Sequence, residues 1–170
     1  TVRRYLASQK KLDDYIQNQL TQDNDVFVRR NLAENPNINE VTQLKLLHDE
    51  DFLVKIIIAG NSYLSETLQL KIMQDSSLRS SLARNPNIDL NIILELTQES
   101  NINIRRDLVE YHDLDDFILL KFLEEDNSLK SRVIEKENLT ENVQLKLFDL
   151  ADYSSDRSNL AKKSYISEII

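Results

Sequence analysis

The chain contains no cysteine and no tryptophan, and its 170 residues include one glycine and two prolines. Without cysteine it can form no disulfide framework, no thiolate metal site and no thiol nucleophile. Strand-rich folds need turn residues about every 8 to 12 positions. Because glycine and proline are so scarce, the chain is predicted to be all-α.

Long apolar runs are also missing. No stretch approaches the roughly 18 apolar residues that span a bilayer, and no signal peptide is recognisable, so we expect a cytoplasmic protein with no membrane contact. The net charge is −8, with a pI near 4.8, which disfavours bulk attraction to nucleic acid. The length favours a single domain over residues 1–170.

The sequence repeats itself. Residues 31–38 read "NLAENPNI", residues 81–88 read "SLARNPNI", and midway between them residues 54–64 read "VKIIIAGNSYL". When the rest of the chain is aligned with these segments, repeat units are found that start near residues 2, 28, 54, 78, 104, 129 and 156, which gives a pitch of about 25 residues. The chain starts inside one unit and ends just after a second-helix start, so we expect a fragment of a longer tandem array.

Each unit is predicted to contain two helices. In the first helix, places one, five and six are apolar, as in Val28, Leu32 and Ala33, and lie on one side. The sixth place is alanine in the first four units, which permits close packing. This helix is expected to end at an asparagine, a residue that tolerates the left-handed conformation at a helix end. These asparagines are Asn35, Asn61 and Asn85.

The second helix is predicted to start after an N-cap residue. These residues are Asp13, Asn39, Ser65, Asp89, Asp115, Thr140 and Ser167. Its apolar residues form one column of Leu44, Leu70, Leu94, Leu120 and Leu145, and another of Leu46, Ile72, Leu96, Phe122 and Leu147. The two columns together cover a wide arc, so each second helix is expected to bury surface against neighbours on two sides.

The pattern "D-x-x-VRR-x-LA-x-NPN-I", followed by a "QL-x-LL-x-D" helix, resembles the leucine-rich repeat variant family and related HEAT-like bacterial solenoids. The likeness covers essentially the whole chain. It is best at 23–49 and 75–99, weaker in the unit where Ser62 replaces proline, and weakest after 126. It implies a right-handed α-solenoid of about six and a half stacked helix pairs, with a role in interaction rather than catalysis.

Every unit carries a cation at the second place of its first helix. This cation column comprises Arg3, Arg29, Lys55, Arg79, Arg105 and Lys130, and Arg157 aligns with it. Acids precede these cations by four to six residues, at Asp23, Asp49, Asp75, Glu99, Glu125 and Asp152. We favour structural pairing between the two sets. The alternative is a row of phosphate contacts in a nucleic-acid-binding array, which a likeness to HEAT-like DNA glycosylases supports and the acidic composition opposes.

The next two places of the first helix vary between units, and we call them the variable stripe. It comprises Arg4, Tyr5, Arg30, Asn31, Ile56, Ile57, Ser80, Ser81, Arg106 and Asp107, with Ser131 and Arg132 in the sixth unit. Ile56 and Ile57 could form an apolar anchor within a polar rim. The alternative is that these isoleucines belong to a more deeply buried helix.

The sequence contains few residue patterns that would indicate a catalytic site. His48 and His112 are far apart in sequence and are expected to be solvated, without a metal site. Gln17, Gln43, Gln69 and Gln144 share a column that is expected to form hydrogen bonds between units. No phosphate loop or nucleophile elbow is present. We therefore predict no enzyme activity and no cofactor, but a monomeric scaffold that binds another protein or peptide.

Overall fold

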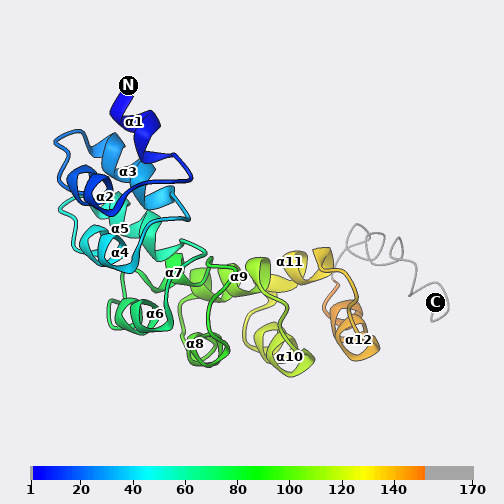
Figure 1. Cartoon of the computed structure of the whole chain (residues 1–170). Coiled ribbons are helices and arrows are strands. Elements are labelled where there is room, and N and C mark those ends of the chain that lie inside the picture. Colours follow the sequence, from blue (N-terminus) through cyan, green and yellow to red (C-terminus); the bar gives the residue numbers. More distant parts are fainter. Residues whose placement is uncertain (1, 152–170) are drawn as a thin grey trace. The chain divides into compact units, whose positions relative to one another are not determined.

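The computed structural model describes residues 2–151, which form α-helices and one short 3-10 helix and contain no strand (Figure 1). The all-helical prediction is confirmed for this part of the chain. The described chain divides into two compact units, one up to Glu99 and one from Ser100 onward, where a single domain was expected. The seventh predicted unit, near 156, lies outside the described residues.

The helices alternate as the sequence pattern predicts, with first helices carrying odd numbers and second helices even numbers. The first compact unit contains α1 (Val2–Ala7), α2 (Asp14–Leu20), α3 (Val26–Glu34), α4 (Glu40–Leu47), α5 (Phe52–Ala59), α6 (Glu66–Met73), α7 (Arg79–Leu82) and α8 (Leu90–Leu96). The second contains α9 (Ile102–Tyr111), α10 (Asp116–Glu125), η1 (Asn127–Leu129), α11 (Lys130–Glu135) and α12 (Glu141–Asp149).

Capping side chains set the helix starts. Asp13, Asn39, Ser65, Asp89 and Asp115 all occupy N-cap positions and accept a hydrogen bond from a main-chain N–H of the following helix, as predicted. Thr140 also lies at an N-cap, but its hydroxyl donates to the Asp116 carboxylate instead. Ser167 lies outside the described residues.

Successive helix pairs pack in the same way within the first compact unit. Helix α3 contacts both helices of the preceding pair, α1 and α2, and α5 likewise contacts α3 and α4 (Figure 1). Ala7, Ala33, Ala59 and Ala83 have no exposed surface, as close approach of neighbouring helices requires. In the second unit α9 packs against α11, and α10 packs against α12.

One predicted apolar column of the second helices was placed wrongly. Leu46, Ile72, Leu96, Phe122 and Leu147 are fully buried, whereas Leu44, Leu70, Leu94 and Leu145 are about half exposed. Residues two apart on a helix point about 200° away from each other. Because Leu46 faces the first helices, Leu44 must face outward. The second helices therefore bury one main face rather than a wide arc.

Candidate interaction surface

Three rows of polar side chains join successive helix pairs and fix the surface between them. The first row contains the three asparagines. The side-chain amide of Asn35 donates to the main-chain oxygens of Ala7 and Gln9, both at 2.8 Å, and its Oδ1 accepts from the Asn37 N–H at 2.9 Å. Asn61 donates to the Ala33 oxygen at 2.9 Å. Each amide therefore binds the main chain of the pair before it.

The reason predicted for these asparagines was wrong. Asn35 has φ −73° and ψ 119°, an extended conformation, and among residues 2–151 only Asn138 of the non-glycine residues has a positive φ. Asparagine is needed at these places because a short amide can donate to the preceding pair while accepting from the main-chain N–H two residues on. Asn85 does the same, donating to the Asn61 oxygen and accepting from Asn87.

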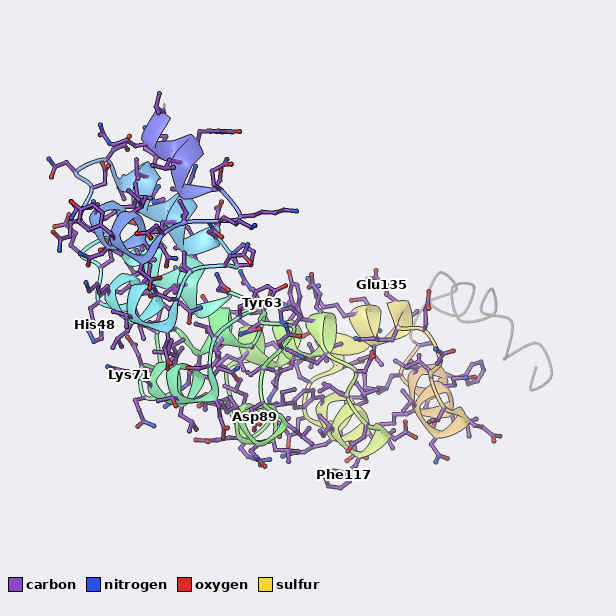
Figure 2. The ribbon with its side chains drawn as sticks, viewed as in Figure 1. His48, Tyr63, Lys71, Asp89, Phe117 and Glu135 are labelled. Carbon is purple, nitrogen blue, oxygen red and sulfur yellow. The ribbon has the colours of Figure 1, made fainter. Side chains whose placement is uncertain are left out.

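In the second compact unit, the place of this asparagine is taken by a different residue type. Lys136 occupies the equivalent place on the sixth pair, and its Nζ donates to the main-chain oxygen of His112 at 2.7 Å. His112 itself is buried, so the expectation that both histidines are solvated is wrong for His112. It is right for His48, which is exposed at the end of α4 (Figure 2).

The glutamine column forms the second row. Gln17 accepts from the Asn39 N–H at 2.9 Å, and Gln69 accepts from the Asp89 N–H at 2.8 Å. Gln43 donates to the Tyr63 oxygen of the following pair at 3.1 Å. The prediction of hydrogen bonds between units is confirmed for these three glutamines. Gln144 donates to Leu139 within its own pair.

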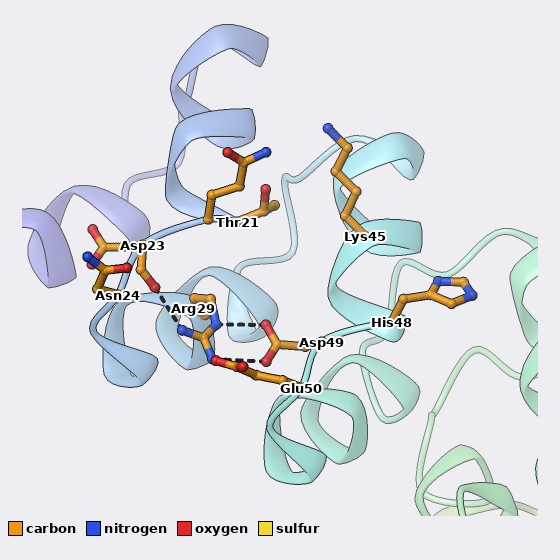
Figure 3. A pocket seen from close by; sticks show the side chains of 9 residues that line it. Thr21, Asp23, Asn24, Arg29, Lys45, His48, Asp49 and Glu50 are labelled. Carbon is orange, nitrogen blue, oxygen red and sulfur yellow. Dashed lines mark hydrogen bonds and ion pairs between the residues drawn. The ribbon is translucent and has the colours of Figure 1, made fainter.

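The cation column forms the third row, and Arg29 is its most buried member (Figure 3). Its Nε and Nη2 donate to the two carboxylate oxygens of Asp49 at 2.7 and 3.1 Å, and Nη2 also donates to Glu50 at 3.2 Å. Its Nη1 donates to the main-chain oxygen of Asp23 at 2.7 Å. The hydrogen bond to Asp49 raises the pKa of Arg29. The guanidinium is thus held by the protein, and Arg29 is one of the residues that line a polar hollow of about 500 Å³.

The same pairing recurs along the column with the acid about 20 residues after the cation. The ion pairs are Arg3 with Asp23, Arg29 with Asp49, Arg79 with Glu99, and Arg105 with Glu125. Lys55 lies near enough to Asp75 to lower the pKa of that carboxyl, although hydrogen bonds from Ser77 are the larger cause. Lys130 donates to the Leu150 main-chain oxygen.

Structural pairing was predicted with the acid that precedes each cation, but Arg3, Arg29, Arg79 and Arg105 bind the carboxylate of an acid that follows them. The acid that precedes Arg29, Asp23, offers Arg29 its main-chain oxygen, and its carboxylate binds Arg3. The Asp23 loop therefore binds the cations of two successive helix pairs. A guanidinium already held by a carboxylate gains little from a phosphate, because the phosphate would have to displace that partner.

The arginines of the variable stripe are also paired. Arg4 binds Asp25 and Arg30 binds Asp51, both with 2.9 Å contacts. The two guanidinium groups lie 4.4 and 5.4 Å from the ring centroid of Phe27. Distances of this size are favourable for cation–π contacts. Desolvation would raise the pKa of Asp25, but hydrogen bonds from the Phe27 N–H and from Arg4 outweigh it, so the pKa is lowered.

The remaining stripe residues differ in how accessible they are. Ser81 and Asp107 are buried, so their prediction as surface contacts is wrong, and Tyr5 is largely exposed. Asn31 donates to the Arg4 oxygen and Arg106 donates to Asn103. The stripe residues that are half-buried, with part of their surface open, are Arg4, Arg30, Asn31, Ile56, Ile57, Ser80, Arg106 and Arg132.

Ile57 lines a hollow that the sequence pattern did not reveal. This Ile57 hollow has a volume of about 420 Å³, and its lining includes Ala33, Pro36, Gly60 and Tyr63. Tyr63 is about two-thirds exposed and stands at the surface of the chain (Figure 2). The neighbour of Ile57 in sequence, Ile58, has no exposed surface. The two alternatives, a surface anchor and a buried helix, therefore apply to different residues: Ile58 is core and Ile57 is partly accessible.

The Ile57 hollow combines apolar and polar walls. Proline, isoleucine and the tyrosine ring supply the apolar part, and Glu34, Asn61 and Ser62 complete the rim. The Asn61 side chain is already engaged with Ala33 and Tyr63, so it holds the hollow's shape. A cavity of this kind suits one apolar side chain of a partner, with polar groups around it.

Other kinds of site find no support within residues 2–151. No group of three or more His, Asp or Glu side chains there could hold a metal ion. No helix in this range is long and apolar enough to cross a membrane.

No protein-family model matches the sequence, and no curated protein or solved structure matches it either. Function is therefore inferred from the chain's own geometry.

Proposed function

We propose that the protein is a non-catalytic scaffold that binds another protein or peptide. In this proposal its helix pairs form a right-handed solenoid of the kind seen in the leucine-rich repeat variant family. The recurrence of the same contacts at a pitch of about 25 residues supports this likeness. Such arrays bury their core by stacking and leave one face of each unit free to vary in sequence.

The observation that carries the proposal is the Ile57 hollow. Ile57 belongs to the variable stripe, is half-buried, and lines an open cavity. The polar neighbours on the stripe, Arg30 and Asn31, are already oriented by bonds within the protein. A rim that is already oriented loses little conformational entropy when a partner binds.

The test is a selection of displayed peptides on the full chain, followed by affinity measurement with variants. Selected peptides should carry an apolar anchor residue. Ile57→Glu should weaken their binding about 30-fold, since loss of an anchor costs about 2 kcal/mol or more. Its melting temperature should stay close to that of the parent.

Leu44→Glu is the matched control, because Leu44 is also partly exposed but lies on the outer face of α4. It should leave peptide affinity unchanged. A large fall in melting temperature for Ile57→Glu would show that Ile57 is core, and equal effects of the two variants would show that the hollow is not the binding site.

Nucleic-acid binding by the cation column is the alternative, and the pairing of Arg29 with Asp49 weakens it. Fluorescence anisotropy with duplex DNA separates the two functions. Tight binding that falls steeply between 50 and 200 mM salt and is lost in Arg29→Ala would favour the nucleic-acid function.

A further inference from the structure

The second compact unit contains a hollow that corresponds, place by place, to the Ile57 hollow of the first. It lies between α9 and α11, and we call it the Arg132 hollow. Arg132 stands at the fourth place of its unit, as Ile57 does, and its guanidinium forms an ion pair with Glu110 of the preceding helix pair. Glu110 stands at the seventh place, where α3 carries Glu34. Each hollow therefore has a glutamate on the wall that the preceding pair supplies.

The two hollows differ in what faces that glutamate. The Arg132 hollow has a volume of about 200 Å³, against about 420 Å³ for the Ile57 hollow. Gly60 has no side chain where Glu135 stands at the equivalent place, and isoleucine replaces the arginine. Within residues 2–151, the exposed Glu34 carboxylate has no ion-pair or hydrogen-bond partner. The Ile57 hollow therefore contains the acid of this pair without its cation.

The other walls of the Ile57 hollow suit a guanidinium better than an ammonium. Tyr63 is about two-thirds exposed and Pro36 is also exposed, and both line the hollow together with Glu34. A planar guanidinium stacks on an aromatic face, and the aliphatic part of an arginine packs on apolar surface. The acid is specific to this junction, because the other seventh places of the first compact unit are Ser8, Gly60 and Arg84.

We propose that the peptide bound in the Ile57 hollow carries an arginine beside its apolar anchor, and that this arginine pairs with Glu34. The inference rests on the proposed function, since it names the chemistry of the peptide that the same hollow binds. The partner would supply from outside the cation that Arg132 supplies within the chain. Carboxylates bind guanidinium groups through two parallel hydrogen bonds, which fixes their orientation. The net charge of −8 also favours the approach of a basic peptide.

The test compares displayed-peptide selections on the full chain and on its Glu34→Arg variant. Peptides selected on the parent should be enriched in arginine near the apolar anchor, and those selected on Glu34→Arg should carry aspartate or glutamate there instead. One parent-selected peptide is then synthesised with arginine, lysine or glutamine at that position. Glutamine should weaken binding to the parent about threefold or more, as loss of a partly exposed ion pair does, and lysine should weaken it less.

The same peptides measured on two further variants separate contact from overall charge. On Glu34→Gln, the arginine and glutamine peptides should bind equally. Glu66→Gln is the matched control, because Glu66 is an exposed glutamate on α6 outside the hollow, and it should keep the preference for arginine. Peptides that lose affinity in Ile57→Glu but show no preference for arginine would overturn this inference and leave the proposed function standing. A selection that yields no binding peptide would overturn both.

Ile57→Arg tests the pairing without any peptide. It places an arginine of the chain itself at the place that Arg132 occupies in the second compact unit, so this arginine should pair with Glu34 and block peptide binding. Adding Glu34→Gln to Ile57→Arg should then lower the melting temperature, whereas Glu34→Gln alone should leave that of the parent nearly unchanged. Equal effects of Glu34→Gln in the two backgrounds would show that a guanidinium in this hollow does not reach Glu34, and would overturn the inference.

Discussion

Asn35→Ala tests whether the buried asparagine row holds successive helix pairs together. The substitution removes two hydrogen bonds to the main-chain oxygens of Ala7 and Gln9, and one from the Asn37 N–H. Asn35 is only 4% exposed, so water cannot readily replace the lost donors. At about 1 kcal/mol net for each bond, the free energy of unfolding should fall by about 3 kcal/mol.

The measurement is urea denaturation followed by circular dichroism. For a chain of this size, a loss of about 3 kcal/mol corresponds to roughly 6–12 °C in melting temperature. Asn35→Asp keeps the side-chain volume but places a carboxylate oxygen against two carbonyls, so it should destabilise at least as much. Asn37→Ala is the matched control: this exposed asparagine should change stability by less than about 0.5 kcal/mol. If Asn35→Ala and Asn37→Ala have equal effects, the row does not hold the pairs together.

Two further predictions concern the ion pairs. Arg29→Ala leaves the buried Asp49 carboxylate without its cation and should cost about 3 kcal/mol in urea denaturation. Arg3→Ala, at an arginine whose side chain is 65% exposed, should cost clearly less; equal losses would contradict the difference in burial of the two arginines. The hydrogen bond from Arg30 lowers the pKa of Asp51 below its ordinary value of 3.8. The stability this supplies is therefore fully present above that value and is lost as the pH falls through the lowered pKa. Arg30→Gln should make acid unfolding below pH about 4 less steep, and an unchanged acid profile would show that the pair does not contribute.

Much of the local structure follows from sequence because it depends on local physics. The helix starts were predictable, since Asp13 and Asn39 cap through bonds to main-chain groups two or three residues away. The buried alanines were also predictable, because Ala33 recurs at one place in a helical pattern. First-helix boundaries differ slightly: α3 starts at Val26, because Asp25 caps it, rather than at residue 28.

The candidate site was only partly predictable. The variable stripe contained Ile57, but its hollow is built by Pro36 of the preceding pair and by Tyr63 beyond the helix. No pattern within one unit shows which side chains from two pairs surround a cavity. The burial of Ser81 and Asp107 was missed for the same reason, because small and polar residues carry no burial signal of their own.

The sequence by itself determined the period, the helical class, the caps and the presence of a cation at one place of each unit, because all of these depend on residue types at fixed spacings. Only the tertiary structure decided the partners across pairs. Arg29 binds the Asp49 carboxylate rather than that of Asp23, which is nearer in sequence. The Asn35 amide donates to the main chain of the preceding pair. Stacking brings residues about 20 to 28 positions apart into contact, and hydrogen-bond geometry then selects among several acids and amides that sequence spacing alone leaves equivalent.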